Sequence, residues 1–271
     1  MIDAPPRAAE LIFGRPLLER LLIQCRRAGI QRILVRVKSG DRDKCQPALG
    51  RYTTDPAVTL VDADDGLSAG LDRAEPCVAI RGNLVLAQSQ LRRAITGYGS
   101  LHGNGSRVVS SDPEHGGSLE VGTLGELLRG DLLNGHHPLA GGRLPSGYLP
   151  YALNGRPEDR TEAELRLAKA VRNESASTDA FMARMVDRRL SWRLSYRLAR
   201  TRIMPNHVTL ANTALGFGCA AMFASSSYWV RLAGALLFLV SITIDGVDGE
   251  LARLRMVESK FGGQLDVFTD N

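Results

Sequence analysis

Glycine is missing from the first thirteen residues, MIDAPPRAAELIF. A loop that cradles a triphosphate uses consecutive backbone N–H groups in a glycine-rich turn. The start of the chain therefore predicts no phosphate-binding loop. The same residues also lack the apolar run of a secretory signal. We expect the start to be clipped rather than processed.

Paired cysteines are also missing. The four cysteines are Cys25, Cys45, Cys77 and Cys219, and no C-x-x-C pair occurs. No histidine stands at zinc-ligand spacing from any of them. This pattern excludes a zinc ribbon and a disulfide framework, and it indicates reduced, buried thiols in a cytosolic setting.

Basic residues outnumber acidic residues: the formal net charge is +5 and the pI is about 9.2. The mean hydropathy is −0.10. Such a chain is too polar to be wholly embedded in a membrane. Its basic balance fits nucleic acid, an anionic membrane surface or phosphorylated substrates. The arginines gather at 184–200, just before two apolar runs. This position favours a membrane surface and predicts no nucleic-acid partner.

Residues 1–155 predict an α/β domain of the Rossmann-like type. Helical periodicity covers 14–30, where apolar side chains share one side and Gly29 ends the helix. We expect strands at 31–37, 57–63 and 77–86, helices at 65–74 and 89–98, and further strands at 106–111 and 118–124. This alternation predicts a mostly parallel sheet with helices on both faces.

Residues 156–177 are rich in charged helix formers and predict a helical connector. Residues 178–204 predict a basic amphipathic helix beside the membrane. Its apolar positions are Phe181, Met185, Leu190, Leu194 and Leu198, and its basic positions are Arg184, Arg188, Arg189, Arg193, Arg197 and Arg200. The alternative is an ordinary helix with a solvated face.

Residues 205–271 predict an all-α transmembrane domain: two membrane helices and the start of a third. The apolar runs at 206–224 and 232–244 are each slightly short of the ~20 residues that a bilayer requires, and their flanks extend them. Tyr228 and Trp229 fit an interfacial aromatic belt. Arginines before the first span predict a multi-pass protein of the inner membrane with its N-terminal domain in the cytoplasm. A soluble helical hairpin is the alternative.

Acidic residues follow the second apolar run at regular spacing. Asp245, Asp248 and Ala252 stand at i, i+3 and i+7, on one helical face. Asp266 and Asp270 are four residues apart, so they also share a face. Four carboxylates near a membrane require a cation, and oxygen ligands favour Mg²⁺ or Mn²⁺. With Arg253 as a phosphate donor fork, the pattern predicts phosphoryl transfer with two metal ions. The alternative is a set of surface aspartates that cap helices and pair with nearby cations.

This spacing resembles the signature of the CDP-alcohol phosphotransferase (phosphatidyltransferase) family. The matching positions are Asp245, Asp248, Gly249, Ala252, Arg253, Gly262, Asp266 and Asp270, and the earlier PNHVT resembles the family's first membrane helix. The resemblance implies an enzyme that moves a phosphoalcohol from a CDP-alcohol to a hydroxyl acceptor and releases CMP, in phospholipid or polar head-group synthesis.

The resemblance also implies residue roles. Asp245 and Asp266 would touch both ions, Asp248 one ion and Asp270 the other. Asp270 would also be the general base. The donor would contact Gly249, Arg253 and Ser259, together with Ala252, Gly262, Asn206 and Thr209. The implied partners are a CDP-alcohol, an acceptor (inositol phosphate, glycerol phosphate or a lipid alcohol), the membrane and a second copy of the chain.

The chain further resembles one branch of that family, the bifunctional inositol-phosphate cytidylyltransferases and di-inositol-phosphate phosphate synthases. In that branch a sugar-nucleotidyltransferase-like domain makes the CDP-alcohol that the membrane part consumes. Here the glycine-rich loop is missing, and Asn83 stands where a metal-binding Asp is expected. We therefore expect a degenerate first domain.

Two other functions remain open. One is nucleotidyltransferase activity of the first domain, and the other is a non-catalytic, membrane-tethered nucleotide-binding fragment. Because the acceptor pocket would come from later helices, we expect these 271 residues to hold the donor and metal half of a site, with little activity alone.

Overall fold

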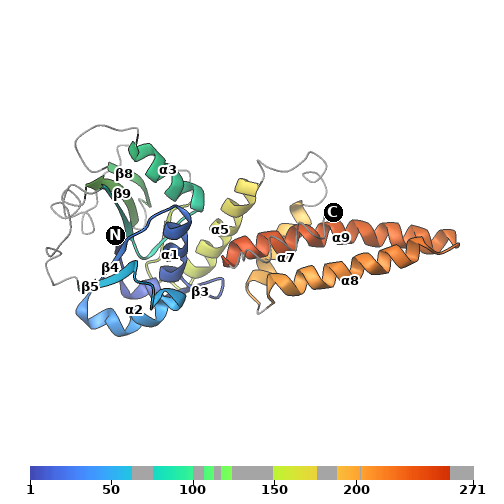
Figure 1. The fold of residues 1–271 in the computed structure, drawn as a ribbon, viewed down its shortest axis with the longest axis horizontal. Helices are drawn as coiled ribbons and strands as arrows, with labels where there is room; N and C mark the ends of the chain where they lie inside the picture. The colour runs from blue at the N-terminus through green and yellow to red at the C-terminus, as the bar shows by residue number, and fades with distance from the viewer. Residues whose placement is uncertain are drawn as a thin grey trace. The chain divides into compact units, whose positions relative to one another are not determined.

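The structure, a computed structural model, describes residues 1–62, 76–99, 107–112, 117–123, 149–175, 188–201 and 203–256 (Figure 1). The chain divides into two compact units. Unit 1 runs from Met1 to Ala170 and unit 2 from Val171 to Asn271. Each unit is described by itself below.

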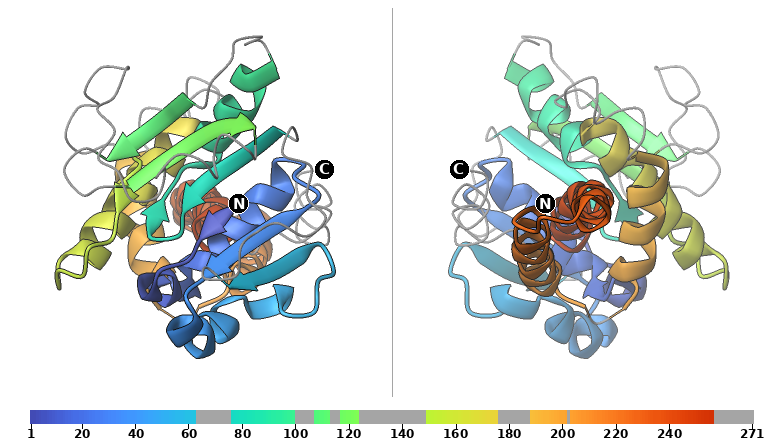
Figure 2. Two further views of the ribbon diagram at one scale, coloured as in Figure 1. Left: turned by 90° about the vertical axis from the view of Figure 1, so that its left-hand side faces the viewer. Right: turned by 90° about the vertical axis from the view of Figure 1, so that its right-hand side faces the viewer.

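Unit 1 is built on a six-stranded sheet with the order β5-β4-β1-β6-β9-β8 (Figure 2). These strands are β1 (Ile2–Asp3), β4 (Ile33–Val37), β5 (Val58–Asp62), β6 (Pro76–Arg81), β8 (Arg107–Asp112) and β9 (Gly117–Thr123). The first four in space are parallel, whereas β9 pairs antiparallel with both β6 and β8. The α/β class is therefore confirmed, with an antiparallel pair at one edge of the sheet.

Strand β1 was missed by the sequence analysis, although it lies between β4 and β6. Ile2 is paired with Val35 on one side and with Ile80 on the other. The N-terminal amine of Met1 donates to the carbonyl oxygen of Val78. A two-residue strand is too short to show an alternating pattern, so periodicity could not reveal it.

The strand expected at 77–86 is wrong as a single element. Strand β6 ends at Arg81, and β7 (Leu84–Val85) pairs instead with β10 (Tyr151–Ala152). Gly82 lies in the turn, where its N–H donates to the Asp3 carbonyl oxygen at 2.6 Å. A Cβ atom at this position would lie 2.6 Å from the same oxygen. Only glycine allows this approach, and the turn separates the two strands.

The described helices of unit 1 are α1 (Leu17–Arg27), α2 (Arg42–Ala48), α3 (Gln88–Gly99) and α5 (Asp159–Ser175), with short 3₁₀ turns at Pro6–Ala9, Ser39–Asp41 and Gly50–Tyr52 and a hairpin of β2 (Leu11–Ile12) and β3 (Arg15–Pro16). Three of these helices, α1, α3 and α5, form where helices were predicted, whereas α2 was not predicted. Helix α1 buries its apolar side, and Gly29 follows it with φ +87°. The helix expected at 65–74 lies outside the described residues.

The expected cysteine chemistry agrees with the structure. All four thiols are free, and Cys25, Cys45 and Cys219 are buried. Burial raises the pKa of the Cys25 thiol to about 11. A thiol with so high a pKa carries little thiolate at neutral pH, so Cys25 is a core residue rather than a nucleophile.

Helix α5 forms within the predicted connector and packs into unit 1. The Phe13 N–H donates to the carboxylate of Glu164 at 3.1 Å, and Glu164 is fully buried. The Tyr151 hydroxyl donates to Asp159 at the start of the helix. These contacts join α5 to the sheet region. The predicted division of the chain into residues 1–155, 156–177, 178–204 and 205–271 stays a prediction.

Unit 2 contains α7 (Arg188–Ala199), α8 (Pro205–Phe223) and α9 (Tyr228–Arg255). Helices α8 and α9 form a tight antiparallel hairpin, visible side by side in Figure 1. Gly234 allows close packing, because a Cβ there would lie 3.0 Å from the Met222 Cβ. The helix expected at 178–204 is described only from 188 and ends at Ala199, so Pro205 begins α8 rather than ending α7.

The hairpin exposes large apolar side chains. Phe217 and Trp229 are each 74% exposed, and Leu210, Tyr228, Leu236 and Leu239 are also exposed. Within the described parts of the chain, α9 is the one helix long and apolar enough to cross a membrane. Two helices therefore form where two membrane spans were predicted, and one of them meets this criterion. The start of the third lies outside the described residues.

Candidate functional site

The first half of the acidic signature lies on the last turns of α9. This 28-residue helix contains Asp245, Asp248, Gly249, Ala252 and Arg253. The helix assumed from their spacing is therefore present. Asp245 and Arg253 are exposed, and Gly249 and Ala252 are partly exposed. A Cβ at Gly249 would meet no described atom within 4 Å. This part of the helix leaves room for a ligand to approach the backbone.

Asp245 is joined to α8 by a short chain of hydrogen bonds. Asn212 Nδ2 donates to Asp245 Oδ1 at 3.3 Å. On its other side Asn212 Oδ1 accepts a bond of 2.8 Å from Ser241 Oγ. The sequence analysis missed both partners. The available signal was an Asn in the middle of an uncharged apolar run and a Ser one turn before Asp245.

The expected donor residues at the start of α8 lie at the same end of the hairpin. The helices are antiparallel, and the Asn212–Asp245 bond fixes their register, so the first turns of α8 lie beside the last turns of α9. Asn206 is exposed, and the Thr209 hydroxyl donates to the Pro205 carbonyl oxygen at 3.3 Å. The structure therefore brings Asn206 and Thr209 to the end that carries Arg253.

Arg255 holds the corner between α7 and α8 against the end of α9. Its guanidinium donates to the carbonyl oxygens of Leu198 at 3.1 Å, Ala199 at 3.1 Å and Ile203 at 2.7 Å, and to that of Thr201. Carbonyl groups at a helix C-terminus have no partner within the helix, so a cation satisfies them well. The sequence analysis gave Arg255 no role of its own, so it missed these contacts at the corner.

Helix α7 leaves an apolar side chain outside the packing of unit 2. The small residues Ser195 and Ala199 are buried, whereas Leu194 is 39% exposed. Arg193, Arg197 and Arg200 are exposed. A helix with an exposed leucine and several exposed arginines has the character expected at an anionic membrane surface.

The second half of the signature lies beyond the described residues. Helix α9 is followed by Met256 in the left-handed conformation, with φ 54°. Ser259, Gly262, Asp266 and Asp270 come after it and are not described. Among the described residues, no group of three or more His, Cys, Asp or Glu side chains gathers at one point. The donor set still fits a hard divalent cation, since it supplies carboxylate oxygens only.

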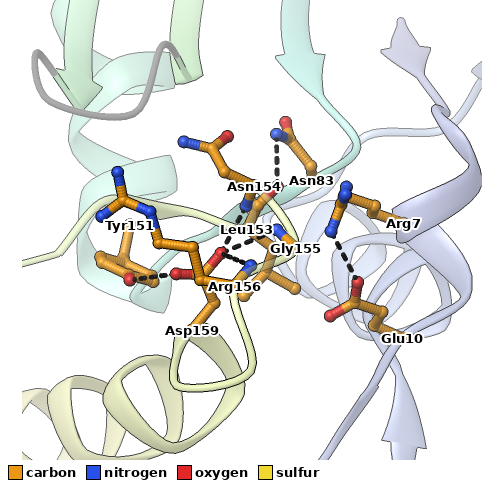
Figure 3. A network of polar contacts seen from close by, with 9 residues as sticks. All are labelled: Arg7, Glu10, Asn83, Tyr151, Leu153, Asn154, Gly155, Arg156 and Asp159. Atoms are coloured by element: carbon orange, nitrogen blue, oxygen red, sulfur yellow. Dashed lines mark hydrogen bonds and ion pairs between the residues drawn. The ribbon is translucent and has the colours of Figure 1, made fainter.

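Asn83 in unit 1 joins two segments of the fold. Its side chain is buried, and its Nδ2 donates to the Leu153 carbonyl oxygen at 3.0 Å (Figure 3). The amide thereby fixes the segment that follows β10. The amide oxygen Oδ1, the atom that could bind a cation, is buried and has no hydrogen-bond partner among the described residues. A neutral amide is a poor anchor for Mg²⁺, and the degenerate first domain stays a prediction.

The Asp159 carboxylate accepts hydrogen bonds from the segment after β10 in the same network (Figure 3). Its Oδ2 accepts bonds from the N–H groups of Asn154, Gly155 and Arg156 at 2.7, 2.8 and 3.1 Å, and its Oδ1 accepts from the Tyr151 hydroxyl at 2.9 Å. Burial opposes ionisation, but these four hydrogen bonds lower the pKa of Asp159 below its usual value. Burial and the bond to Asp159 together raise the pKa of Tyr151.

Arg7 closes the network from the other side. Its guanidinium is paired with Glu10 at 3.4 Å and lies directly over Gly155. A Cβ atom on Gly155 would fall 1.6 Å from Arg7 Nη1, and Gly155 has φ +94°. The region that joins the 3₁₀ turn at Pro6–Ala9 to the segment after β10 is thus filled by the chain's own side chains.

Comparison with known proteins relates the C-terminal part of the chain to one family. Residues 202–271 match the family described as CDP-alcohol phosphatidyltransferase. The chain is also similar to proteins named bifunctional IPC transferase and DIPP synthase. It is 36% identical to those of Thermococcus kodakarensis and Archaeoglobus fulgidus over 114 residues, and 33% identical to that of Aquifex aeolicus over 115 residues.

Each of these three matches covers 42% of this chain. The chain spans about a quarter of the length of these relatives, with shares of 25%, 22% and 25%. The resemblance drawn from the acidic signature, including its bifunctional branch, is confirmed.

Proposed function

We propose that the protein is an integral-membrane transferase, because residues 202–271 match the CDP-alcohol phosphatidyltransferase family. It moves a phosphoalcohol from a CDP-alcohol to an acceptor hydroxyl, releases CMP, and serves phospholipid or polar head-group synthesis. The observation that carries this proposal is the placing of Asp245, Asp248, Gly249, Ala252 and Arg253 on the end of one helix, beside the start of α8.

The carboxylates supply the metal ligands in this proposal. Asp245, Asp248, Asp266 and Asp270 would hold two Mg²⁺ or Mn²⁺ ions, and the ions would neutralise the charge of the diphosphate and of the leaving CMP. Asp245 and Asp266 would be ligands of both ions. Carboxylates so close together at a membrane border are stable as anions only when a cation compensates their repulsion.

The donor lies along the ends of α8 and α9. The Arg253 guanidinium offers a fork of N–H donors that matches phosphate oxygens. Gly249 and Ala252 admit the nucleotide close to the helix backbone. Ser259, Gly262, Asn206 and Thr209 complete the donor contacts. The antiparallel register of the hairpin supports the grouping of Asn206 and Thr209 with Arg253.

The reaction then needs one proton acceptor. Asp270 takes the proton of the acceptor hydroxyl as its oxygen attacks the phosphorus atom that carries the donor's alcohol. The bond from that phosphorus to the bridging oxygen of CMP breaks, and CMP leaves with the bridging oxygen. A positioned carboxylate base contributes roughly 10²–10⁴-fold to such a step.

The membrane setting follows from unit 2. Helix α9 is long and apolar enough to cross a bilayer, and α7, which packs against α9, carries exposed arginines. We assign the protein to the inner membrane as a multi-pass homodimer, with unit 1 and the active site in the cytoplasm. CDP-alcohols are then available at the end of α9. The names of the relatives favour inositol phosphate as acceptor over glycerol phosphate or a lipid alcohol.

Nucleotidyltransferase activity of unit 1 is the weaker candidate. Asn83 Nδ2 donates to the Leu153 carbonyl oxygen, and a neutral amide at this position is a poor anchor for Mg²⁺. A tethered nucleotide-binding role without catalysis remains the alternative for the 271 residues alone.

The proposal is tested by CMP release from CDP-alcohols in detergent or nanodiscs. We expect the full protein that contains this sequence to release CMP only with Mg²⁺ or Mn²⁺ and an acceptor, and to lose this activity with a chelator. Asp270→Asn should lower the rate by about 10²–10⁴-fold. Glu250→Gln, which changes an acid of α9 outside the signature, should retain it. Metal-independent release, or an active Asp270→Asn variant, would contradict the proposal.

A further inference from the structure

We propose that Asn212, oriented by Ser241, is a positioning residue that holds the Asp245 carboxylate in the geometry required for metal binding. This inference rests on the proposed function. It adds a residue of α8 to a signature that otherwise lies on α9 and beyond.

The hydrogen bond to Asp245 fixes which way the amide of Asn212 points. An ionised carboxylate only accepts hydrogen bonds, so the amide must present its NH₂ group to Asp245. Asp245 therefore selects the orientation of the amide. In this orientation the Ser241 hydroxyl donates to the amide oxygen at 2.8 Å and stabilises it. Ser241 is buried and Asn212 half-buried, which protects the bond between them from water.

The bond to Asp245 restrains a side chain that is otherwise exposed. Asp245 lies at the surface of the hairpin. Asn212 holds Oδ1 from the neighbouring helix at 3.3 Å, a length at the long end for an N–H···O bond. Carboxylates that bind metals are themselves held by such partners, and loss of a partner typically costs 10–100-fold in metal affinity or activity.

A simpler role for the same contacts is to join the two helices. Polar side chains that bond across apolar helices contribute to their association. The two roles predict different results. A purely cohesive contact affects the stability of the hairpin, whereas a positioning contact affects the metal concentration that the site requires.

The chain offers variants that separate these roles. Asn212→Ala removes the donor, and Asn212→Leu removes it while keeping an apolar side chain of similar size between the helices. Ser241→Ala removes only the orienting bond. Thr213→Ala and Thr243→Ala are matched controls, because their hydroxyls bond to the Thr209 and Leu239 carbonyl oxygens within their own helices.

The measurement is binding of Mn²⁺ to the full protein, followed by electron paramagnetic resonance of the free ion, with CMP release measured in parallel. We expect Asn212→Ala and Asn212→Leu to raise the half-saturating Mn²⁺ concentration by at least ~10-fold. Ser241→Ala should raise it less, and both threonine controls should match the unchanged protein. Thermal melting of each variant checks that the variant is folded before its Mn²⁺ affinity is compared.

The outcomes separate the inference from the proposed function. If both Asn212 variants bind Mn²⁺ as tightly as the unchanged protein, the inference is wrong. CMP release by the unchanged protein would still support the proposed function in that case. If the unchanged protein binds Mn²⁺ without CMP release, the proposed function is wrong and the Asn212 variants still decide the inference. If it neither binds Mn²⁺ nor releases CMP, both are wrong.

Discussion

The two units use their polar side chains in different ways. In unit 1, Asp159 accepts four hydrogen bonds and Asn83 is pinned by a backbone carbonyl group. In unit 2, Asp245 and Arg253 are exposed at the end of a helix hairpin whose sides are apolar. These groups of unit 1 form hydrogen bonds within the protein, whereas the side chains of Asp245 and Arg253 in unit 2 reach the surface. We infer that the chemistry belongs to unit 2 and that the described polar network of unit 1 is structural.

The largest effect on unit 1 is expected from Asp159→Ala. The change leaves three backbone N–H groups and the Tyr151 hydroxyl without their acceptor. Hydrogen bonds to a charged group are worth about 1.5–3 kcal/mol each, so the free energy of opening at 151–156 should fall by at least about 2 kcal/mol. Hydrogen exchange of the full chain measures it. Glu158→Ala, at an exposed neighbour, is the control. A change no larger than that of Glu158→Ala would refute the structural role.

Asn83→Asp tests whether unit 1 can regain a metal site. A carboxylate at this position faces the Leu153 carbonyl oxygen, and the hydrogen bond of 3.0 Å is lost. We expect unit 1 to lose about 1–3 kcal/mol of stability and to form no CDP-alcohol from CTP and an alcohol phosphate. Asn173→Asp, at an exposed position of α5, should have little effect. Product formation by Asn83→Asp would weaken the contrast between the units.

Arg255→Ala should loosen the corner between α7 and α8. The carbonyl groups of Leu198, Ala199, Thr201 and Ile203 lose their donor. We expect amide exchange at 200–204 to become about tenfold faster, equivalent to roughly 1.4 kcal/mol. Arg255→Lys should give an intermediate rate, because lysine keeps the charge without the fork.

The control for this change is Arg231→Ala, at an exposed position near the other end of α9. It should leave exchange at the corner unchanged. Equal rates in Arg255→Ala and Arg231→Ala would show that the described carbonyl contacts do not hold the corner.

The smallest effect expected is a dependence of the stability of unit 1 on pH. Hydrogen bonds lower the pKa of Asp159 in the folded protein, while an unfolded Asp has a pKa of about 3.9. The stabilisation is therefore complete above pH ~4 and is lost as pH falls toward the lower folded pKa. Opening free energies at pH 5, 4 and 3 should decline more steeply in the unchanged protein than in Asp159→Asn. Parallel declines would contradict the assignment.

Periodicity predicted the elements that are long enough to show it. Helix α1, strands β4 and β5, and the antiparallel pair at 107–123 lie where the pattern placed them. It failed at β1, which has two residues, and at Gly82, where a close approach to Asp3 breaks a continuous apolar run. Both failures depend on contacts between segments far apart in the sequence.

The candidate site divides in the same way. The spacing from Asp245 to Arg253 identified residues that share one helix, because spacing determines position on a helix. It did not identify Asn212, Ser241 or the role of Arg255, because these act across helices. The facing of Asp266 and Asp270 toward Asp245 stays a prediction.

A structure of the full protein with Mn²⁺ and a CDP-alcohol, read by the anomalous scattering of manganese, tests the central claim most directly. We predict two manganese peaks about 3.5–4 Å apart, both in contact with Asp245 and Asp266, with Asp248 on one ion and Asp270 on the other. The claim would be contradicted by carboxylate pairs that face away from each other with no shared ion between them.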